Sequence, residues 1–175
     1  MNAQSFCAIA ASLMLAACAT EVPEIINPDL PPLPNAGDLA AFRVGSQPLG
    51  RFLLDKKNVG IGVDGVVRYV LVMRGSGGAS SATFEGIRCK TGEYKLYASV
   101  GGNDWRPFSD KTWKPIPGRT SYGSLLSGYG GNDPRGVLAE DVLCDGSTTL
   151  RRDEIIFRLN GKHVDFLDPS HSVGE

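Results

Sequence analysis

A cysteine near the N-terminus is the first residue whose surroundings specify chemistry. Cys18 closes the run Leu15-Ala16-Ala17-Cys18, the lipobox pattern that bacterial lipoprotein processing recognises. The small side chains before Cys18 give a peptidase access to the preceding bond, and the thiol would then carry the lipid. Because each buried methylene contributes about 0.8 kcal/mol, two or more acyl chains would hold the protein on a membrane. The pattern predicts lipidation of Cys18; the alternatives are an ordinary cleaved leader or an apolar terminal helix.

The segment before Cys18 has the length and composition of an export signal. Residues 1–17 are apolar through their centre, and a membrane-spanning helix would require about 20 apolar residues. Lys and Arg are absent from residues 1–5, which departs from the usual positively charged start. We therefore expect 1–17 to be a lipoprotein signal peptide. The mature protein is expected outside the cytoplasm, anchored by its lipid to a bacterial membrane, the outer membrane facing the periplasm.

Two further cysteines belong to the folded part of the chain. Cys89 and Cys144 are the thiols that remain once Cys7 in the leader and Cys18 are set aside. An oxidising compartment would pair them, and closing this loop would restrict the unfolded chain by about 4 kcal/mol. The alternative is two buried free thiols. A metal site is not indicated, because no CxxC spacing and no nearby histidine accompany them.

No pattern in the sequence indicates catalysis, a cofactor or a nucleic-acid partner. The histidines are His163 and His171, and no GxSxG motif accompanies them. Gly-Gly-Asn-Asp occurs at 101–104 and 130–133, but the copies are not in tandem, so loop conformations explain them better than calcium does. With 18 basic and 19 acidic residues the net charge is -1, and no basic stripe is present to bind phosphates.

Two groups of residues remain as possible binding sites. Arg68, Glu85 and Arg88 fall on neighbouring expected strands and could meet on one sheet face, as a buried ion-pair network or as an anion site. The middle third of the chain also concentrates aromatic residues that could line a groove for a glycan, peptide or lipid. These are Tyr97, Trp105, Phe108, Trp113, Tyr122 and Tyr129. The alternative for this second group is packing in the core and loops.

An antiparallel meander must position these side chains. The β-branched and aromatic run at 66–73, followed by 81–89 and 93–100, predicts three strands joined by short Gly-rich turns. The first of these is apolar on both faces, so we expect it to be central. A shorter strand is expected at 51–54.

The third strand of the meander alternates between an apolar and a polar side. Tyr94, Leu96, Ala98 and Val100 share one parity, while Lys95 and Tyr97 have the other. This predicts a sheet covered on one side only. The cover is expected from helices at 135–143 and at 150–159, the second capped by Thr149 and ended by Asn160-Gly161. An α+β fold follows.

The organisation of the chain follows from its composition. Five prolines between residues 19 and 36 indicate an extended polyproline spacer. We therefore expect a lipidated, Pro-rich tether over 18–39, a single domain over 40–166, and a frayed tail over 167–175.

Several motifs together resemble the CNP-one-like family of exported bacterial proteins. They are Val67-Arg68-Tyr69, Phe84-Glu85-Gly86-Ile87-Arg88-Cys89, Tyr94-Lys95-Leu96-Tyr97-Ala98, Trp113, Asn132, Arg135, Leu138 and Cys144. The resemblance covers roughly residues 40–160 and implies one compact domain with Cys89 paired to Cys144, but no activity. The chain departs from the family pattern at 117–131, where a Gly- and Ser-rich loop is longer than expected.

These observations together favour a lipid-anchored envelope protein without catalysis of its own. Its expected partners are the membrane, through the N-terminal lipid, and an envelope protein or glycan. One alternative is a hydrolase that acts on an envelope polymer. Another is a secreted soluble ligand carrier, which would require the lipobox interpretation to be wrong.

Overall fold

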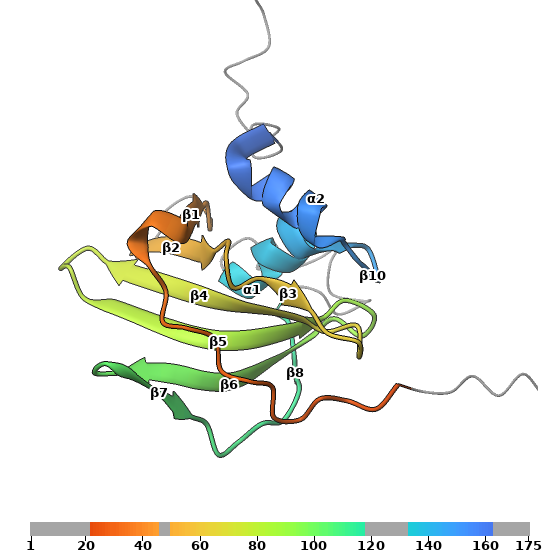
Figure 1. Ribbon diagram of the computed structural model, residues 1–175. Coiled ribbons are helices and arrows are strands. Elements are labelled where there is room, and N and C mark those ends of the chain that lie inside the picture. The colour runs from red at the N-terminus through yellow and green to blue at the C-terminus, as the bar shows by residue number, and fades with distance from the viewer. Residues whose placement is uncertain (1–21, 46–49, 118–132, 163–175) are drawn as a thin grey trace, which may run out of the picture.

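Antiparallel strands joined by short turns form the centre of the molecule (Figure 1). The computed structural model describes residues 22–45, 50–117 and 133–162. In these residues one sheet has the order β1-β2-β4-β5-β6-β7, with β3 paired to β4 and β8 paired to β6. Its strands are β1 (Leu39–Phe42), β2 (Gly50–Asp55), β3 (Gly60–Ile61), β4 (Val67–Gly75), β5 (Ser80–Arg88), β6 (Glu93–Gly101), β7 (Asp104–Pro107) and β8 (Lys114–Pro115).

The expected meander is confirmed as β4, β5 and β6, and the short strand at 51–54 is confirmed as β2. Gly75 N–H donates to Ala79 O at 2.8 Å and closes the first hairpin. The second turn ends at Gly92, whose φ of 67° favours a residue without a side chain. The strand β4 lies between β5 on one side and β2 and β3 on the other. Its central position explains why both of its faces are apolar.

Helices cover one face of the sheet. They are α1 (Pro134–Val137), which continues into the π-helix η3 (Leu138–Leu143), and α2 (Arg152–Phe157), which continues into η4 (Arg158–Lys162). The buried cluster on this side joins the helices to the sheet; it includes Tyr69, Leu71, Ile87, Leu138, Leu143 and Ile155. We call this side the helix face. An α+β architecture is confirmed, and within the described part of the chain no helix is long and apolar enough to cross a membrane.

The second helix begins later than the sequence predicts. Thr149 lies in the two-stranded pair β9 (Cys144–Asp145) and β10 (Thr148–Thr149), and its hydroxyl donates to Gly65 O at 3.1 Å. The N-cap is Arg151, which makes no side-chain capping hydrogen bond. The predicted cap is therefore wrong by two residues. The predicted end is confirmed, because Gly161 has a φ of 85°.

A disulfide joins Cys89, which follows β5, to Cys144, which follows η3. The bond ties the sheet to the helices that cover it. In the chain-entropy model, a loop of 55 residues restricts the unfolded chain by about 4 kcal/mol. The sequence-based pairing of these two cysteines is confirmed.

The opposite face of the sheet is covered by the N-terminal segment, which crosses β6, β5 and β4 before the 3-10 helix η1 (Ala36–Asp38) and β1 (Figure 1). We call residues 22–35 the strap. Partial burial recurs at Ile25, Pro28, Pro31 and Pro34, the three-residue period of a polyproline helix with one side against a surface. In the described part of the expected tether, the chain is thus attached to the sheet rather than acting as a free spacer.

A bulge in β6 changes the expected alternation. The pairing shifts between Phe84, opposite Ala98, and Glu85, opposite Leu96, so that Tyr97 is the extra residue. Tyr97 and Ala98 both belong to the buried cluster beneath the strap. The expectation that Leu96 and Ala98 share a face is wrong, and so is the expectation of a sheet covered on one side only. Lys95 and Tyr97 are only 4% and 2% exposed.

Candidate functional site

The structure does not bring Glu85 together with Arg68 and Arg88. Arg68 is paired with Gly86 across the β4–β5 ladder, and alternation places Gly86 and Arg88 on one face and Glu85 on the other. Arg68 and Arg88 therefore lie beneath the strap, whereas Glu85 lies on the helix face. The predicted cluster of three is wrong, and each member has other partners.

On the helix face, the Glu85 carboxylate accepts four hydrogen bonds from three side chains. Arg135 donates through Nε at 2.8 Å and Nη2 at 2.7 Å, Tyr69 through its hydroxyl at 3.1 Å, and Thr83 through its hydroxyl at 2.6 Å. The Glu85 side chain is 0% exposed, and the Arg135 guanidinium stacks over the Tyr94 ring at 4.5 Å. A buried carboxylate with this set of donors is stable because its lone pairs are satisfied.

Within this buried group, the pKa values of both Tyr69 and Arg135 are raised. Burial and the adjacent Glu85 carboxylate raise the pKa of the Tyr69 hydroxyl well above its usual value. Burial alone would lower the pKa of Arg135, but the charge and hydrogen bonds of Glu85 outweigh it and raise that pKa. Tyr69 therefore stays neutral, and the fully buried Glu85 carboxylate cannot be reached by a substrate.

Beneath the strap, two cations and an indole converge on a single carboxylate. Glu24 accepts hydrogen bonds from Lys95 Nζ, from Arg88 Nη2 at 3.1 Å and from Trp113 Nε1 at 2.9 Å. The Arg88 guanidinium lies 4.0 Å and the Lys95 ammonium 4.7 Å from the centre of the Trp113 ring, within the range of a cation–π interaction. We call Glu24, Arg88, Lys95 and Trp113 the Glu24 clasp.

The Glu24 clasp holds its carboxylate in the ionised form. Partial burial would raise the pKa of Glu24, but the hydrogen bonds from Lys95, Trp113 and Arg88 and the Lys95 charge lower it overall. The Lys95 side chain is only 5% exposed and the Glu24 side chain is 30% exposed, so this pair is partly shielded from water. The clasp is thus a carboxylate-binding site whose occupant belongs to the same chain.

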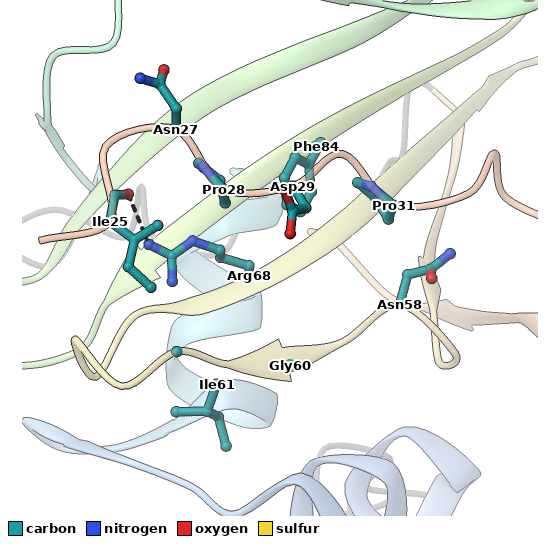
Figure 2. A pocket seen from close by; sticks show the side chains of 11 residues that line it. Ile25, Asn27, Pro28, Asp29, Pro31, Asn58, Gly60, Ile61, Arg68 and Phe84 are labelled. Carbon is teal, nitrogen blue, oxygen red and sulfur yellow. Dashed lines mark hydrogen bonds between the residues drawn. The ribbon is translucent and has the colours of Figure 1, made fainter.

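A second set of contacts binds the backbone of Ile25, the strap residue after Glu24. Asp64 Oδ2 accepts the Ile25 N–H at 3.0 Å, and Arg68 Nη2 donates to Ile25 O at 3.1 Å (Figure 2). Asp64 and Arg68 also form an ion pair of 2.6 Å. A Cβ atom at Gly62 would approach the Arg68 guanidinium to 2.3 Å and Asp64 Oδ1 to 2.4 Å, so a larger residue there would displace the side chains of this pair. We call Asp64 and Arg68 the backbone clamp.

The contacts of the backbone clamp strongly perturb the acidity of Asp64. Burial works to raise its pKa, but the hydrogen bond and charge of Arg68 and the Ile25 N–H outweigh burial and lower the pKa from 3.8 to about 2. The clamp is therefore charged at neutral and at mildly acidic pH.

Further contacts fix the later part of the strap. Trp105 Nε1 donates to Pro31 O at 2.7 Å, and Asn58 Nδ2 donates to Pro32 O at 3.3 Å. Below them Phe84 stacks against Tyr97 at 5.3 Å and against Trp105 at 6.3 Å between ring centres. Of the aromatic residues expected to line an open groove, Tyr97, Trp105 and Trp113 thus lie beneath the strap.

A cavity of about 390 Å³, widely open to solvent, lies between the strap and β3 (Figure 2). Strap residues form one wall, β3 and the preceding loop form the other, and Arg68 and Phe84 lie between them. Pro28 and Pro31 supply apolar surface, and Asn27, Asp29 and Asn58 supply polar groups. The cavity exists only while the strap is in place.

Sequence reasoning identified the sheet residues of this site but missed their partners. Arg68, Arg88, Tyr97, Trp105 and Trp113 all lie beneath the strap. The missed residues are Glu24, Asn58, Asp64 and Lys95. One signal was present, because Glu24 is an acidic residue near the start of a Pro-rich segment that contains no Lys or Arg. Cys18, Tyr122, Tyr129, both histidines and loop 118–131 lie outside the described residues.

Comparisons with known proteins match the part of the chain that forms the strap, the sheet and the helices. The profile of the CNP1-like family matches residues 23–160, which includes the strap as well as the sheet and helices. The chain is 27% identical over 162 residues to "Cryptic neisserial protein 1" of Neisseria gonorrhoeae, covering 81% of this chain and 74% of that protein. No solved structure gives a significant match.

Proposed function

This chain belongs to the CNP1-like family, and from that premise we propose that it is an exported, lipid-anchored protein of the bacterial envelope that acts by binding rather than by catalysis. In this proposal the residues beneath the strap hold the folded domain to the segment that carries the lipid. In this proposal the domain is attached to its anchor by specific hydrogen bonds and ion pairs rather than by a flexible linker.

One observation carries this proposal: the Glu24 clasp and the backbone clamp grip the chain directly downstream of Cys18. Glu24 lies six residues after Cys18, and its carboxylate receives two cations and an indole N–H. A flexible spacer would need none of these contacts. Their position shortly after Cys18 supports a role in fixing the domain to the lipid-anchored segment.

Two further features support export. The leader and lipobox at 1–18 have the pattern of a lipoprotein signal. The Cys89–Cys144 disulfide fits an oxidising compartment, because such bonds are rare in the cytosol.

The chemistry of the charged groups supports binding over hydrolysis. Glu85 is fully buried and held by Arg135, and Glu24 is engaged by three donors, so neither carboxylate is placed to exchange protons with a polymer substrate. The cations and aromatic residues that could have formed a ligand site hold the protein's own strap.

Intact mass of the protein purified from membranes tests the anchor. We expect a mature chain that begins at Cys18 and carries the mass of its acyl groups, and Cys18→Ser to leave the membrane fraction. Cys7→Ser is the matched control, because it removes the leader's cysteine and leaves the lipobox unchanged. An unprocessed chain, or a mature terminus without fatty acid, would contradict the proposal.

Crosslinking in intact cells tests the binding role. We expect the wild-type protein to capture a reproducible envelope partner. Release of products from purified envelope polymers by the protein alone would favour a hydrolase instead.

A further inference from the structure

The strap leaves very little chain between the folded domain and the proposed anchor. Val22 is the fourth residue after Cys18, and a fully extended chain covers at most about 3.6 Å per residue. Val22 can therefore lie no more than about 14 Å from the lipid-bearing residue. If the whole 18–39 segment were free, the domain could stand several times farther away. This step rests on the proposed function, because it requires acylation of Cys18.

The outer surface of the strap carries several exposed aliphatic side chains, interspersed with the exposed polar residues Asn27, Asp29 and Asn35. Its side chains that turn away from the sheet include four large aliphatic residues with 41% to 59% of their surface exposed: Val22, Ile26, Leu30 and Leu33. Of the two charged strap residues, Glu24 faces into the clasp, and Asp29 is exposed and lines the cavity beside the strap. Exposed aliphatic groups concentrated on one short segment mark a surface that contacts something apolar.

We propose that the outer surface of the strap lies on the same bilayer that holds the acyl chains, with its aliphatic side chains in the interfacial layer. Each headgroup region is about 5 to 8 Å thick, so the start of the strap is already within reach of this layer. The clasp and clamp then have a second consequence. They remove the polar groups of Glu24 and Ile25 from the outer surface of the strap and leave its aliphatic groups there.

This placement fixes the orientation of the domain. The strap and the sheet face beneath it lie toward the membrane, and the helix face points away from it (Figure 1). Met73 lies on the helix face, opposite the strap. It is 45% exposed and shares the parity of Tyr69 and Leu71, which belong to the helix-face cluster.

A single fluorescent label tests this orientation in the lipidated protein. Cys18 is blocked by lipid, and Cys89 and Cys144 are paired, so an introduced thiol is the one labelled. Ile26→Cys places an environment-sensitive dye on the strap, and Met73→Cys is the matched control at an exposed aliphatic position on the other face. Both proteins are reconstituted into vesicles of phosphatidylethanolamine and phosphatidylglycerol, with and without brominated acyl chains.

We expect the dye at position 26 to shift to the blue and to lose at least half of its emission to the brominated lipid. The dye at position 73 should remain unquenched. Equal exposure of both dyes to water, in protein whose mass shows an acylated Cys18, would overturn this inference and leave the anchor intact. A Cys18 without acyl groups would instead overturn the proposed function and this inference together.

Discussion

The two faces of the central sheet are covered by different means. On the helix face, aliphatic and aromatic side chains from sheet and helices form a continuous buried cluster around one ion pair. On the strap face, a short apolar floor supports an extended segment that is held through charges and single hydrogen bonds. The first cover depends on buried area, and the second depends on a few directed contacts.

This difference indicates how the molecule responds to change. Hydrophobic burial is spread over many side chains, so the helix face forms the cooperative core of the domain. The strap has no neighbouring strand to pair with, and its hold depends on the ionisation of Glu24 and Asp64. Local opening of the strap should therefore require less free energy than unfolding of the core.

The largest expected effect tests the helix face. Arg135→Met should destabilise the whole domain by about 3 to 5 kcal/mol, because it leaves the Glu85 carboxylate buried without its cation. Urea unfolding measures this change. Arg151→Met is the control, since Arg151 and Asp153 form a pair that is 81% and 66% exposed and should not shift the midpoint. Equal midpoints for the two variants would show that the buried pair is not a stability element.

An intermediate effect tests the strap. Glu24→Gln should weaken the hold on the strap by about 1.5 to 3 kcal/mol, because it removes charge-assisted hydrogen bonds and leaves Lys95 without its charge partner. Hydrogen exchange at the Ile25 amide should accelerate, while exchange in β4 stays slow. Glu140→Gln, at an exposed position in η3, is the matched control. Unchanged exchange at Ile25 would show that the strap is held by its apolar floor alone.

The smallest expected effect is the response to acid. The folded pKa of Asp64 is about 2 and its ordinary value is 3.8. A lowered folded pKa contributes stability that is present above about pH 4 and is lost as the pH falls toward 2. The loss at the backbone clamp should be at most about 2 kcal/mol.

The two tryptophans of the chain report this transition. Both indoles donate to strap residues, so their fluorescence should change between pH 4 and pH 2 before the far-ultraviolet circular dichroism does. Asp64→Asn should remove the part of this pH dependence that comes from the backbone clamp and leave the part that comes from Glu24. A fluorescence change that coincides with global unfolding would mean that the two faces are one cooperative unit.

Much of the helix face could be predicted from the sequence, because its signals are local. The β-branched run of β4 and the turn glycines predicted the meander, and the spacing of apolar residues predicted the helix at 135–143. Alternation alone also separates Glu85 from Arg88, because residues three apart on a strand point to opposite faces. Thr149 could not be placed correctly, because its hydroxyl bonds to Gly65, 84 residues away.

The strap face could not be predicted from the same signals. Proline enrichment showed that residues 22–34 are extended, but composition does not reveal what surface an extended segment lies on. The decisive contacts join residues far apart in the chain, 71 residues for Glu24 and Lys95 and 74 for Pro31 and Trp105. The bulge at Tyr97 also shifts the second half of β6 by one residue, which no alternating pattern shows.

By itself the sequence determined the cysteine pair, the meander and the α+β class, because each depends on residue type and short-range spacing, and on the same basis it predicts a leader and a lipobox. Only the tertiary structure decided that the Pro-rich segment is part of the fold and that Arg68, Arg88, Trp105 and Trp113 hold it. The physical reason is that a strap without backbone pairing is positioned by side chains that come together only after the sheet has formed.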